Sequence, residues 1–216
     1  MTFGRRMSVL AVSLAATLVA STAPASADLW PWVQGIPPDK TVHTYCYTTS
    51  VGSGLKSYIP GAMNYLADNT DVEGTYLESP CDIQNSNGPG GDPATDAAWF
   101  QVWVDDAYGQ VECKVRTASQ PGWCDQWHVR INNETIDASA DPHHQYIKTV
   151  CHELGHSVGL AHYNPTLNPP DVPGAVGQPH DCQASGSVTS ANLPGAAGSW
   201  TWQYNQHHKD HINAWF

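Results

Sequence analysis

The chain has 216 residues, of which 41% are hydrophobic, and its 20 acidic residues outnumber 9 lysines and arginines to give a net charge of −11. This length is sufficient for one domain with a sizeable hydrophobic core. An acidic chain with so few basic residues argues against nucleic acid and anionic membranes as partners.

Residues 1–27 have the features of a secretory signal peptide. Arg5 and Arg6 provide a positively charged start, residues 8–20 form an apolar run, and Ala-Ser-Ala at 25–27 is a small-residue cleavage site. The apolar run is too short for a membrane span. Removal of the signal peptide would leave an exported protein of 189 residues, with 7 basic and 20 acidic side chains and a net charge of −13.

The residues that follow are predicted to form short strands, one helix and loops. Residues 28–40, rich in Pro and Trp, are predicted to be an N-terminal arm. Apolar residues at helical spacing predict an amphipathic helix over residues 55–69, despite Pro60 near its start. A loop rich in Asn, Gly and Pro is predicted over residues 83–96. Strands are predicted over residues 41–48, 74–78, 97–105, 111–116 and 127–132.

The last of these strands, residues 127–132, alternates between apolar and polar side chains. It is predicted to be the exposed edge strand above a cleft, where an extended peptide can pair with it through backbone hydrogen bonds. The alternative is an interior strand that makes no contact with a substrate.

A second helix is predicted over residues 146–159, where apolar residues form one narrow stripe. His152 and His156 project roughly 140° to 180° away from that stripe. We therefore expect one side of this helix to be buried in a core and the other to face a cleft. The stripe consists of Ile147, Cys151, Leu154 and Val158.

After this helix the composition changes. Residues 163–199 are dense in Pro, Gly, Asn and Ser, and loops of this length are uncommon unless they are functional. Residues 202–216 are predicted to form a closing helix. The chain is accordingly divided into an N-terminal catalytic subdomain, residues 41–162, and a C-terminal subdomain, residues 163–216.

Residues 152–162 read His-Glu-x-x-His-x-x-Gly-x-x-His. Two histidines four residues apart lie about one helical turn from each other, so both can reach one metal ion. Gly159 tolerates the left-handed conformation that ends a helix, which would let His162 supply a third nitrogen. Three protein ligands leave one tetrahedral position for water, the arrangement of a catalytic zinc. Glu153 is placed to handle the proton of that water.

All six cysteines lie after residue 27, and an even number in an exported chain predicts three disulfides. The spacing leaves the connectivity open, and we expect the pairs 46–81, 113–124 and 151–182. Cys151 points with the apolar stripe of the second helix. A bridge from it to Cys182 would tie this helix to the segment that closes beneath it.

The motif with its third histidine resembles that of the metzincin zinc endopeptidases, in particular secreted bacterial matrixin-like members. The resemblance implies an α+β fold with a mixed, mostly parallel twisted sheet and two main helices. The active-site helix would form the cleft floor, and a loop-rich C-terminal subdomain would end in a helix. It also implies one catalytic Zn²⁺ held by His152, His156 and His162, with Glu153 as general base for a zinc-bound water that attacks peptide bonds.

The chain departs from this family at one position. Metzincins carry a methionine in a turn beneath the metal, whereas all three methionines here precede the motif. Residues 181–186, Asp-Cys-Gln-Ala-Ser-Gly, resemble that turn, with Gln183 in the place of the methionine.

The expected partner is a protein or peptide substrate, cut outside the cell by a monomer. Two other functions remain open. One is a non-catalytic, zinc-stabilised secreted binding protein in which His180 or Asp181 closes the fourth metal position. The other is a metallohydrolase that acts on a non-peptide amide. Tyr163 and Tyr204 are candidates for stabilising an oxyanion, and a calcium or second zinc ion is also left open.

Overall fold

The computed structural model describes residues 35–84, 95–162, 181–189 and 198–216. The predicted signal peptide, most of the N-terminal arm and of the loop at 83–96, and most of the long segment after His162 lie outside the described residues. None of the helices within these ranges combines the length and the hydropathy that a bilayer crossing requires.

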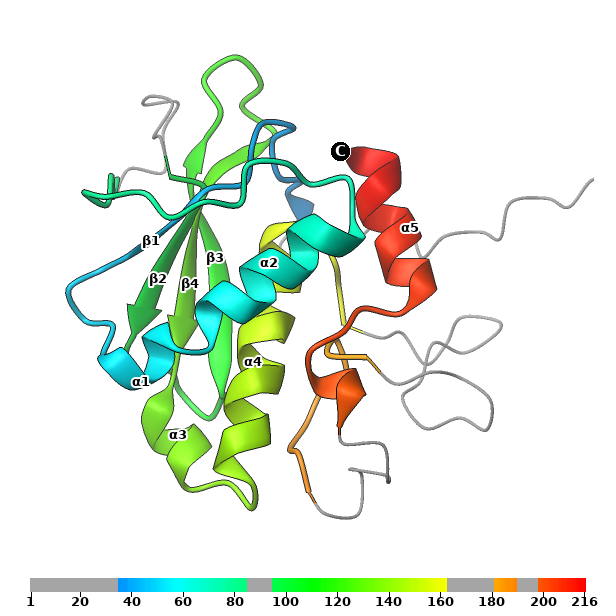
Figure 1. Cartoon of the computed structure of the whole chain (residues 1–216). Coiled ribbons are helices and arrows are strands. Elements are labelled where there is room, and N and C mark those ends of the chain that lie inside the picture. The colour runs from blue at the N-terminus through cyan, green and yellow to red at the C-terminus, as the bar shows by residue number, and fades with distance from the viewer. Residues whose placement is uncertain (1–34, 85–94, 163–180, 190–197) are drawn as a thin grey trace, which may run out of the picture.

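One mixed sheet of four strands forms the first layer of the fold (Figure 1). The strand order is β1-β2-β4-β3; β1, β2 and β4 run parallel, whereas β3 pairs antiparallel with β4. This confirms the predicted α+β class with a mixed, mostly parallel sheet. The strands are β1 (Tyr45–Tyr47), β2 (Ala97–Gln101), β3 (Gly109–Arg116) and β4 (Cys124–Ile131).

The prediction that residues 127–132 form an exposed edge strand is wrong. β4 lies between β2 and β3, so it has a hydrogen-bonded neighbour on each side. Its polar His128 is buried and packs against the ring of Phe100 with centroids 4.6 Å apart. The alternating pattern therefore does not mark a solvent-facing side, and nearly continuous burial is typical of a central strand. The antiparallel edge strand is β3.

Three other predicted strands are shorter than expected. The strand predicted at residues 41–48 is reduced to β1, Tyr45–Tyr47. The strand predicted at residues 97–105 ends at Gln101 as β2. The segment at residues 74–78 makes only an isolated bridge, between Leu77 and Tyr45.

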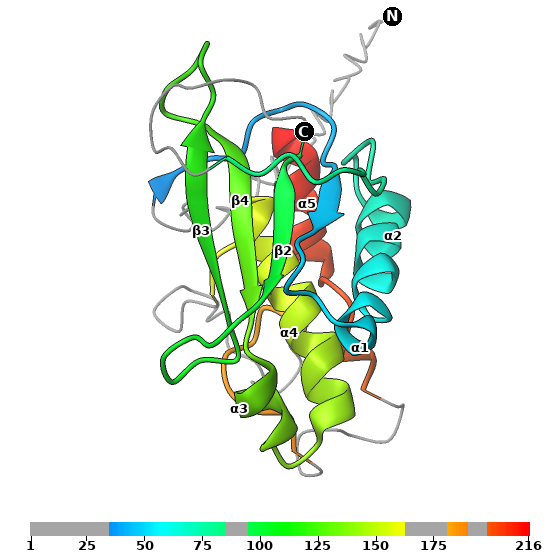
Figure 2. The same ribbon diagram turned by 90° about the vertical axis from the view of Figure 1, so that its left-hand side faces the viewer.

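The helices lie together on one side of the sheet, as Figure 2 shows for α2, α4 and α5. The helix predicted over residues 55–69 is divided into two, and Pro60 lies in the first turn of the second, where a missing N–H costs nothing. The helices are α1 (Ser53–Lys56), α2 (Ile59–Asn69), α3 (Asn133–Asp137), α4 (Pro142–Ser157), the short 3₁₀ helix η2 (Ser199–Thr201) and α5 (Gln206–Trp215).

Helix α4 is buried on more sides than the sequence predicts. Three residues of the apolar stripe are fully buried, while Ile147 is only half-buried. The opposite side is covered as well, because residues 182–188 run along it. The backbone N–H of Val188 donates to the side chain of Gln145 at 2.7 Å. Nearer the other end of the helix, the carbonyl of Cys182 lies 2.8 Å from Nδ1 of His152. The polar face of α4 is therefore buried by residues 182–188, a segment that lies well after the helix in the chain.

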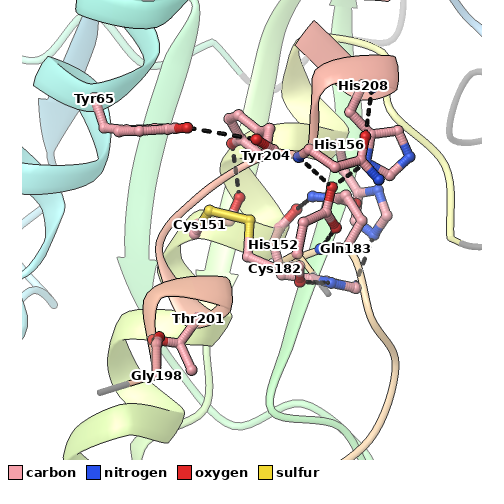
Figure 3. Close-up of a disulfide and its surroundings, with 12 residues drawn as sticks. Tyr65, Cys151, His152, His156, Cys182, Gln183, Gly198, Thr201, Tyr204 and His208 are labelled. Atoms are coloured by element: carbon pink, nitrogen blue, oxygen red, sulfur yellow. Dashed lines mark hydrogen bonds and ion pairs between the residues drawn. A yellow bond between two sulfur atoms is a disulfide. The ribbon is translucent and has the colours of Figure 1, made fainter. Parts of the chain in front are cut away.

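All three predicted disulfides are present. Cys113–Cys124 joins β3 to β4, and Cys46–Cys81 ties β1 to the segment that follows α2. Cys151–Cys182 links α4 to residues 182–188, as expected (Figure 3). The third bridge thus fixes one end of the segment that covers the polar side of α4.

Acid should destabilise the fold through His43, which is buried with its Nε2 3.0 Å from the hydroxyl of Ser157 on α4. Burial lowers the pKa of His43 to about 4, below the value of about 6.5 expected in the unfolded chain. The stability it contributes is therefore complete above about pH 6.5 and is lost as the pH falls towards 4. We expect a loss on the order of 3 kcal/mol from this residue.

Urea unfolding of the metal-free protein at pH 7 and pH 4 measures this effect. His43→Gln should shrink the difference in unfolding free energy between the two pH values, whereas His143→Gln, at an exposed position, should leave it unchanged. An undiminished difference in the His43 variant would contradict the assignment.

Candidate metal centre

Helix α4 carries two of the predicted ligands and ends just before the third. Gly159 adopts a φ of 98°, in the left-handed region. Its N–H donates to the carbonyl of His156 at 3.1 Å, and the N–H of Leu160 donates to the carbonyl of Gly155 at 2.9 Å. This pair of bonds is the Schellman arrangement, which reverses the chain direction after a helix. The turn brings His162 back beside the helix, as the position of Gly159 predicts.

The three histidine side chains converge on one point. Their Nε2 atoms lie 3.1 Å apart for His152 and His156, and 3.0 Å apart for each of these with His162. Among the described residues, this is the only cluster of three or more His, Cys, Asp or Glu side chains whose ligand atoms come close enough to share a metal ion.

Hydrogen bonds on the far side of two of these rings define their tautomers. The Nδ1 of His152 lies 2.8 Å from the carbonyl of Cys182, and the Nδ1 of His156 lies 2.8 Å from the carbonyl of Leu160. A carbonyl oxygen only accepts, so each Nδ1 carries the proton and each Nε2 of a neutral ring presents a lone pair. Lone pairs facing each other at about 3 Å repel, and a cation between them removes this repulsion.

The protonation states also fit a metal. Burial lowers the pKa of His152 well below its ordinary value, and it lowers the pKa of His156 to about 3. Both rings are therefore neutral at neutral pH, which metal binding requires. Tetrahedral zinc with bonds of about 2.0–2.1 Å places its nitrogen ligands about 3.3–3.4 Å apart, close to the separations found here. The donor set thus fits zinc.

Glu153, which follows His152 in the chain, lies against the edge strand β3. It is 4% exposed, and a Cβ added to Gly109 at the start of β3 would lie 2.6 Å from its Oε1. Burial raises the pKa of Glu153 to about 8, and the charge of Lys148 acts in the opposite direction. A cation held by the histidines would likewise favour the ionised carboxylate. The periodicity and spacing of the sequence do not predict the contact between Glu153 and Gly109, because this contact joins a helix to a strand far away in the chain.

Cys182 and Gln183, in the segment that resembles the turn, lie against α4 (Figure 3). Gln183 is fully buried, and its Nε2 donates to the backbone carbonyl of His152 at 2.9 Å. The preceding carbonyl, that of Cys182, accepts from the ring of the same histidine. Gln183 therefore makes a polar contact to the helix where a methionine would make an apolar one.

Two residues considered for the site have other roles. The carboxylate of Asp181 accepts from the backbone N–H groups of Gln183 at 2.8 Å and Asn205 at 2.9 Å, and it also pairs with His208. The hydroxyl of Tyr204 donates to the carbonyl of Cys151 at 2.9 Å. Both therefore brace the C-terminal segment against α4. His180 and Tyr163, also considered, lie outside the described residues.

No protein-family model and no curated protein matches this chain. Among solved structures, it is similar to high choriolytic enzyme 1, a hatching enzyme zinc-protease from the medaka fish Oryzias latipes. The TM-score is 0.42 at 13% identity, over 84% of this chain and 94% of that chain. It is also similar to myroilysin, with a TM-score of 0.36 at 15% identity, over 63% of this chain and 57% of that chain. Similarity this low leaves the function to be inferred from the residues of the site itself.

Gly155 should not tolerate alanine, although alanine is the better helix former by about 1 kcal/mol. A Cβ at this position would lie 2.1 Å from Nε2 of Gln183 and 3.1 Å from a ring carbon of Tyr204. We expect Gly155→Ala to destabilise the metal-free protein by about 2 kcal/mol in urea unfolding, because the buried neighbours must move. Adding Gln183→Ala should recover part of the loss.

The matched control is Gly61→Ala in the first turn of α2, where an added Cβ would meet nothing within 4 Å. This variant should be more stable than the parent by about 1 kcal/mol, as helix propensity predicts. A similar gain from Gly155→Ala would contradict the close packing of Gln183 beneath α4.

Proposed function

We propose that the protein is a secreted zinc-dependent endopeptidase of the metzincin type. The observation that carries this proposal is the convergence of three imidazoles on one point, with the Nε2 atoms 3.0–3.1 Å apart and a buried Glu153 next to His152 in the chain. In this proposal His152, His156 and His162 bind the metal and Glu153 is the catalytic residue. Three disulfides, together with the predicted signal peptide, support export.

The site residues divide the chemistry between them. Zinc held by the histidines would lower the pKa of a coordinated water towards about 7 and polarise the carbonyl of the substrate. The carbonyls of Cys182 and Leu160 hold two of the rings with Nε2 towards the point where the three histidines converge and would hold the metal. Glu153 accepts the proton of the attacking water and transfers it to the leaving amine. Contact with Gly109 restricts where the carboxylate of Glu153 can lie.

The position of β3 supports a peptide as the substrate. Within the described part of the sheet, β3 has β4 on one side and no strand on the other. An extended peptide that paired with this open edge would gain backbone hydrogen bonds that do not depend on its sequence. Because β3 begins at Gly109, such a peptide would run past Glu153. This role, predicted for residues 127–132, is therefore proposed for β3 instead.

One observation favours an enzyme over a zinc-stabilised binding protein. A closed structural site needs a fourth protein ligand, and Asp181, the described candidate for it, is already bonded to His208 and to two backbone N–H groups. Three histidine ligands, with a buried glutamate next to the first of them in the chain, match the open site of a hydrolase more closely.

Zinc analysis combined with a protease assay tests this proposal. We expect about one zinc per chain and hydrolysis of casein or gelatin that stops with 1,10-phenanthroline and returns when zinc is added. Bound zinc without hydrolysis of any protein or peptide would favour the binding protein or a hydrolase of other amides. Hydrolysis that survives complete removal of zinc would overturn the proposal.

A further inference from the structure

Lys148 is a buried cation that the mechanism does not use. It lies one helical turn before His152 on the same face of α4, and it is only 4% exposed. Lysine is almost never fully buried unless its charge is paired. Its amine donates to the carbonyl of Gly186 at 3.1 Å. A carbonyl occupies one of its three donors and does not neutralise its charge.

The acidic side chains considered as partners of Lys148, Asp181 and Glu153, interact with other groups. Among the described residues, no carboxylate lies within ion-pair distance of its amine. Asp181 is bonded to His208 and to backbone N–H groups. Glu153 lies against Gly109 and is required as the general base in the proposed function. The ammonium group of Lys148 is thus buried, although none of the described residues provides the counter-ion that a buried charge normally needs.

The surroundings of the amine place it next to the path proposed for the substrate. Gly186 belongs to an exposed stretch, and the hydroxyl of the next residue, Ser187, lies 2.6 Å from that of Tyr108. Tyr108 directly precedes Gly109, the residue against Glu153. The carbonyl of Gly186, which Lys148 contacts, therefore lies one residue before Ser187. Ser187 is the residue that contacts Tyr108, directly before the start of β3.

The charge of Lys148 also acts on the whole centre. Its place one helical turn before His152 brings this positive charge close to the site that would hold the metal. Burial lowers the pKa of Lys148 itself to about 8, so the ammonium form still predominates at neutral pH. A divalent ion on neutral histidines would add further positive charge, of which Glu153 offsets only part. Such a centre favours an anionic group on the substrate.

We propose that the ammonium of Lys148 binds a carboxylate of the peptide substrate, so that cleavage is directed to a bond next to that carboxylate. This inference rests on the proposed function, in the sense that the zinc centre hydrolyses peptide bonds. The carboxylate has two sources in a peptide, namely the side chain of an Asp or Glu residue beside the scissile bond and the C-terminus of the chain. Either would accept the remaining donors of Lys148 in charge-assisted hydrogen bonds.

Matched fluorogenic peptides separate the two sources. One set carries Glu or Gln at each position flanking the scissile bond, and another carries a free or amidated C-terminus. We expect kcat/KM to be about tenfold to a hundredfold higher for the charged member of one pair, as for a hydrogen bond to a charged group. A ratio near one for every pair in the native enzyme would overturn the proposal without the use of any variant.

Three variants assign the preference to its residue. Lys148→Met should bring the ratio close to one, and Lys148→Arg should largely keep it, because the charge remains. Lys56→Met removes an exposed lysine of α1 and should leave the ratio unchanged. A preference that persists in a folded Lys148→Met protein would also overturn the proposal.

A binding measurement distinguishes this inference from the proposed function. If neither casein nor any peptide is hydrolysed, the endopeptidase proposal fails, but fluorescence anisotropy still compares labelled Glu and Gln peptides on the zinc-loaded protein. Tighter binding of the Glu peptide that disappears in Lys148→Met would support a carboxylate site. Equal dissociation constants for the two peptides would overturn it.

Discussion

Replacing Glu153 with glutamine should reduce kcat/KM for peptide hydrolysis by about 10²- to 10⁴-fold while the zinc content stays the same. Glutamine preserves the shape and volume of the side chain, but its amide does not accept a proton from water. The change leaves the three imidazoles untouched, together with the Nδ1 hydrogen bonds of His152 and His156 to backbone carbonyls. Zinc analysis and a peptide assay on the same preparation measure both quantities.

The matched control for this variant is Glu134→Gln, which changes an exposed carboxyl group in the first turn of α3. It should leave both the activity and the zinc content unchanged. Normal turnover of Glu153→Gln would exclude Glu153 as the general base. Loss of zinc from Glu153→Gln would instead assign Glu153 a part in building the centre.

The same variant should have the opposite effect on stability. Because burial raises the pKa of Glu153 to about 8, the stability linked to its proton is complete below about pH 4.5 and is lost as the pH rises through 8. Metal-free Glu153→Gln should therefore exceed the native protein in unfolding free energy at pH 9, by an amount on the order of 4 kcal/mol. Such a gain in stability with a loss of activity is typical of a catalytic residue.

Gly109→Ala should impair catalysis although residue 109 is not expected to touch the metal. The added Cβ would lie 2.6–2.8 Å from Oε1, Cγ and Cδ of Glu153, so the carboxylate must shift. A misplacement of about 1 Å in a catalytic group can reduce the rate about 10²-fold. We expect a loss of that order in kcat/KM, with zinc content unchanged, because the contact involves the carboxyl group and none of the three histidines.

Gly122→Ala is the matched control, because Gly122 lies in the connection between the same two strands, β3 and β4, and an added Cβ would meet nothing within 4 Å. Its activity should equal that of the native enzyme, and its unfolding free energy should change by less than about 0.5 kcal/mol. Full activity of Gly109→Ala would show that Glu153 does not depend on the start of β3 for its position.

Local patterns in the chain predicted much of the candidate site. The helix of the motif, the reversal at Gly159 and the approach of His162 all depend on residues within about three turns of one another. Helical spacing and the conformational freedom of glycine act over that range, which is why the sequence indicates them. The disulfide pairs were also predicted correctly, partly because Cys151 lies on the apolar stripe.

The errors concern the order of strands and the burial of polar groups. The pattern of residues 127–132 predicted an edge strand, but β4 is central, since β3 folds back along it and His128 is buried against Phe100. Alternation within one strand does not reveal which strands lie on either side of it. Strand order depends on pairing between segments far apart in the chain.

Spacing within one helix and at its end was enough to predict the three histidines, the glutamate after the first of them and the turn that brings the third back. Three further features became visible only in the folded chain: Gly109 confines Glu153, Gln183 supports the backbone of His152, and Lys148 is buried. Each of these contacts joins α4 to β3 or to the segment after residue 180. They form when separate elements pack together, and no local periodicity encodes that packing.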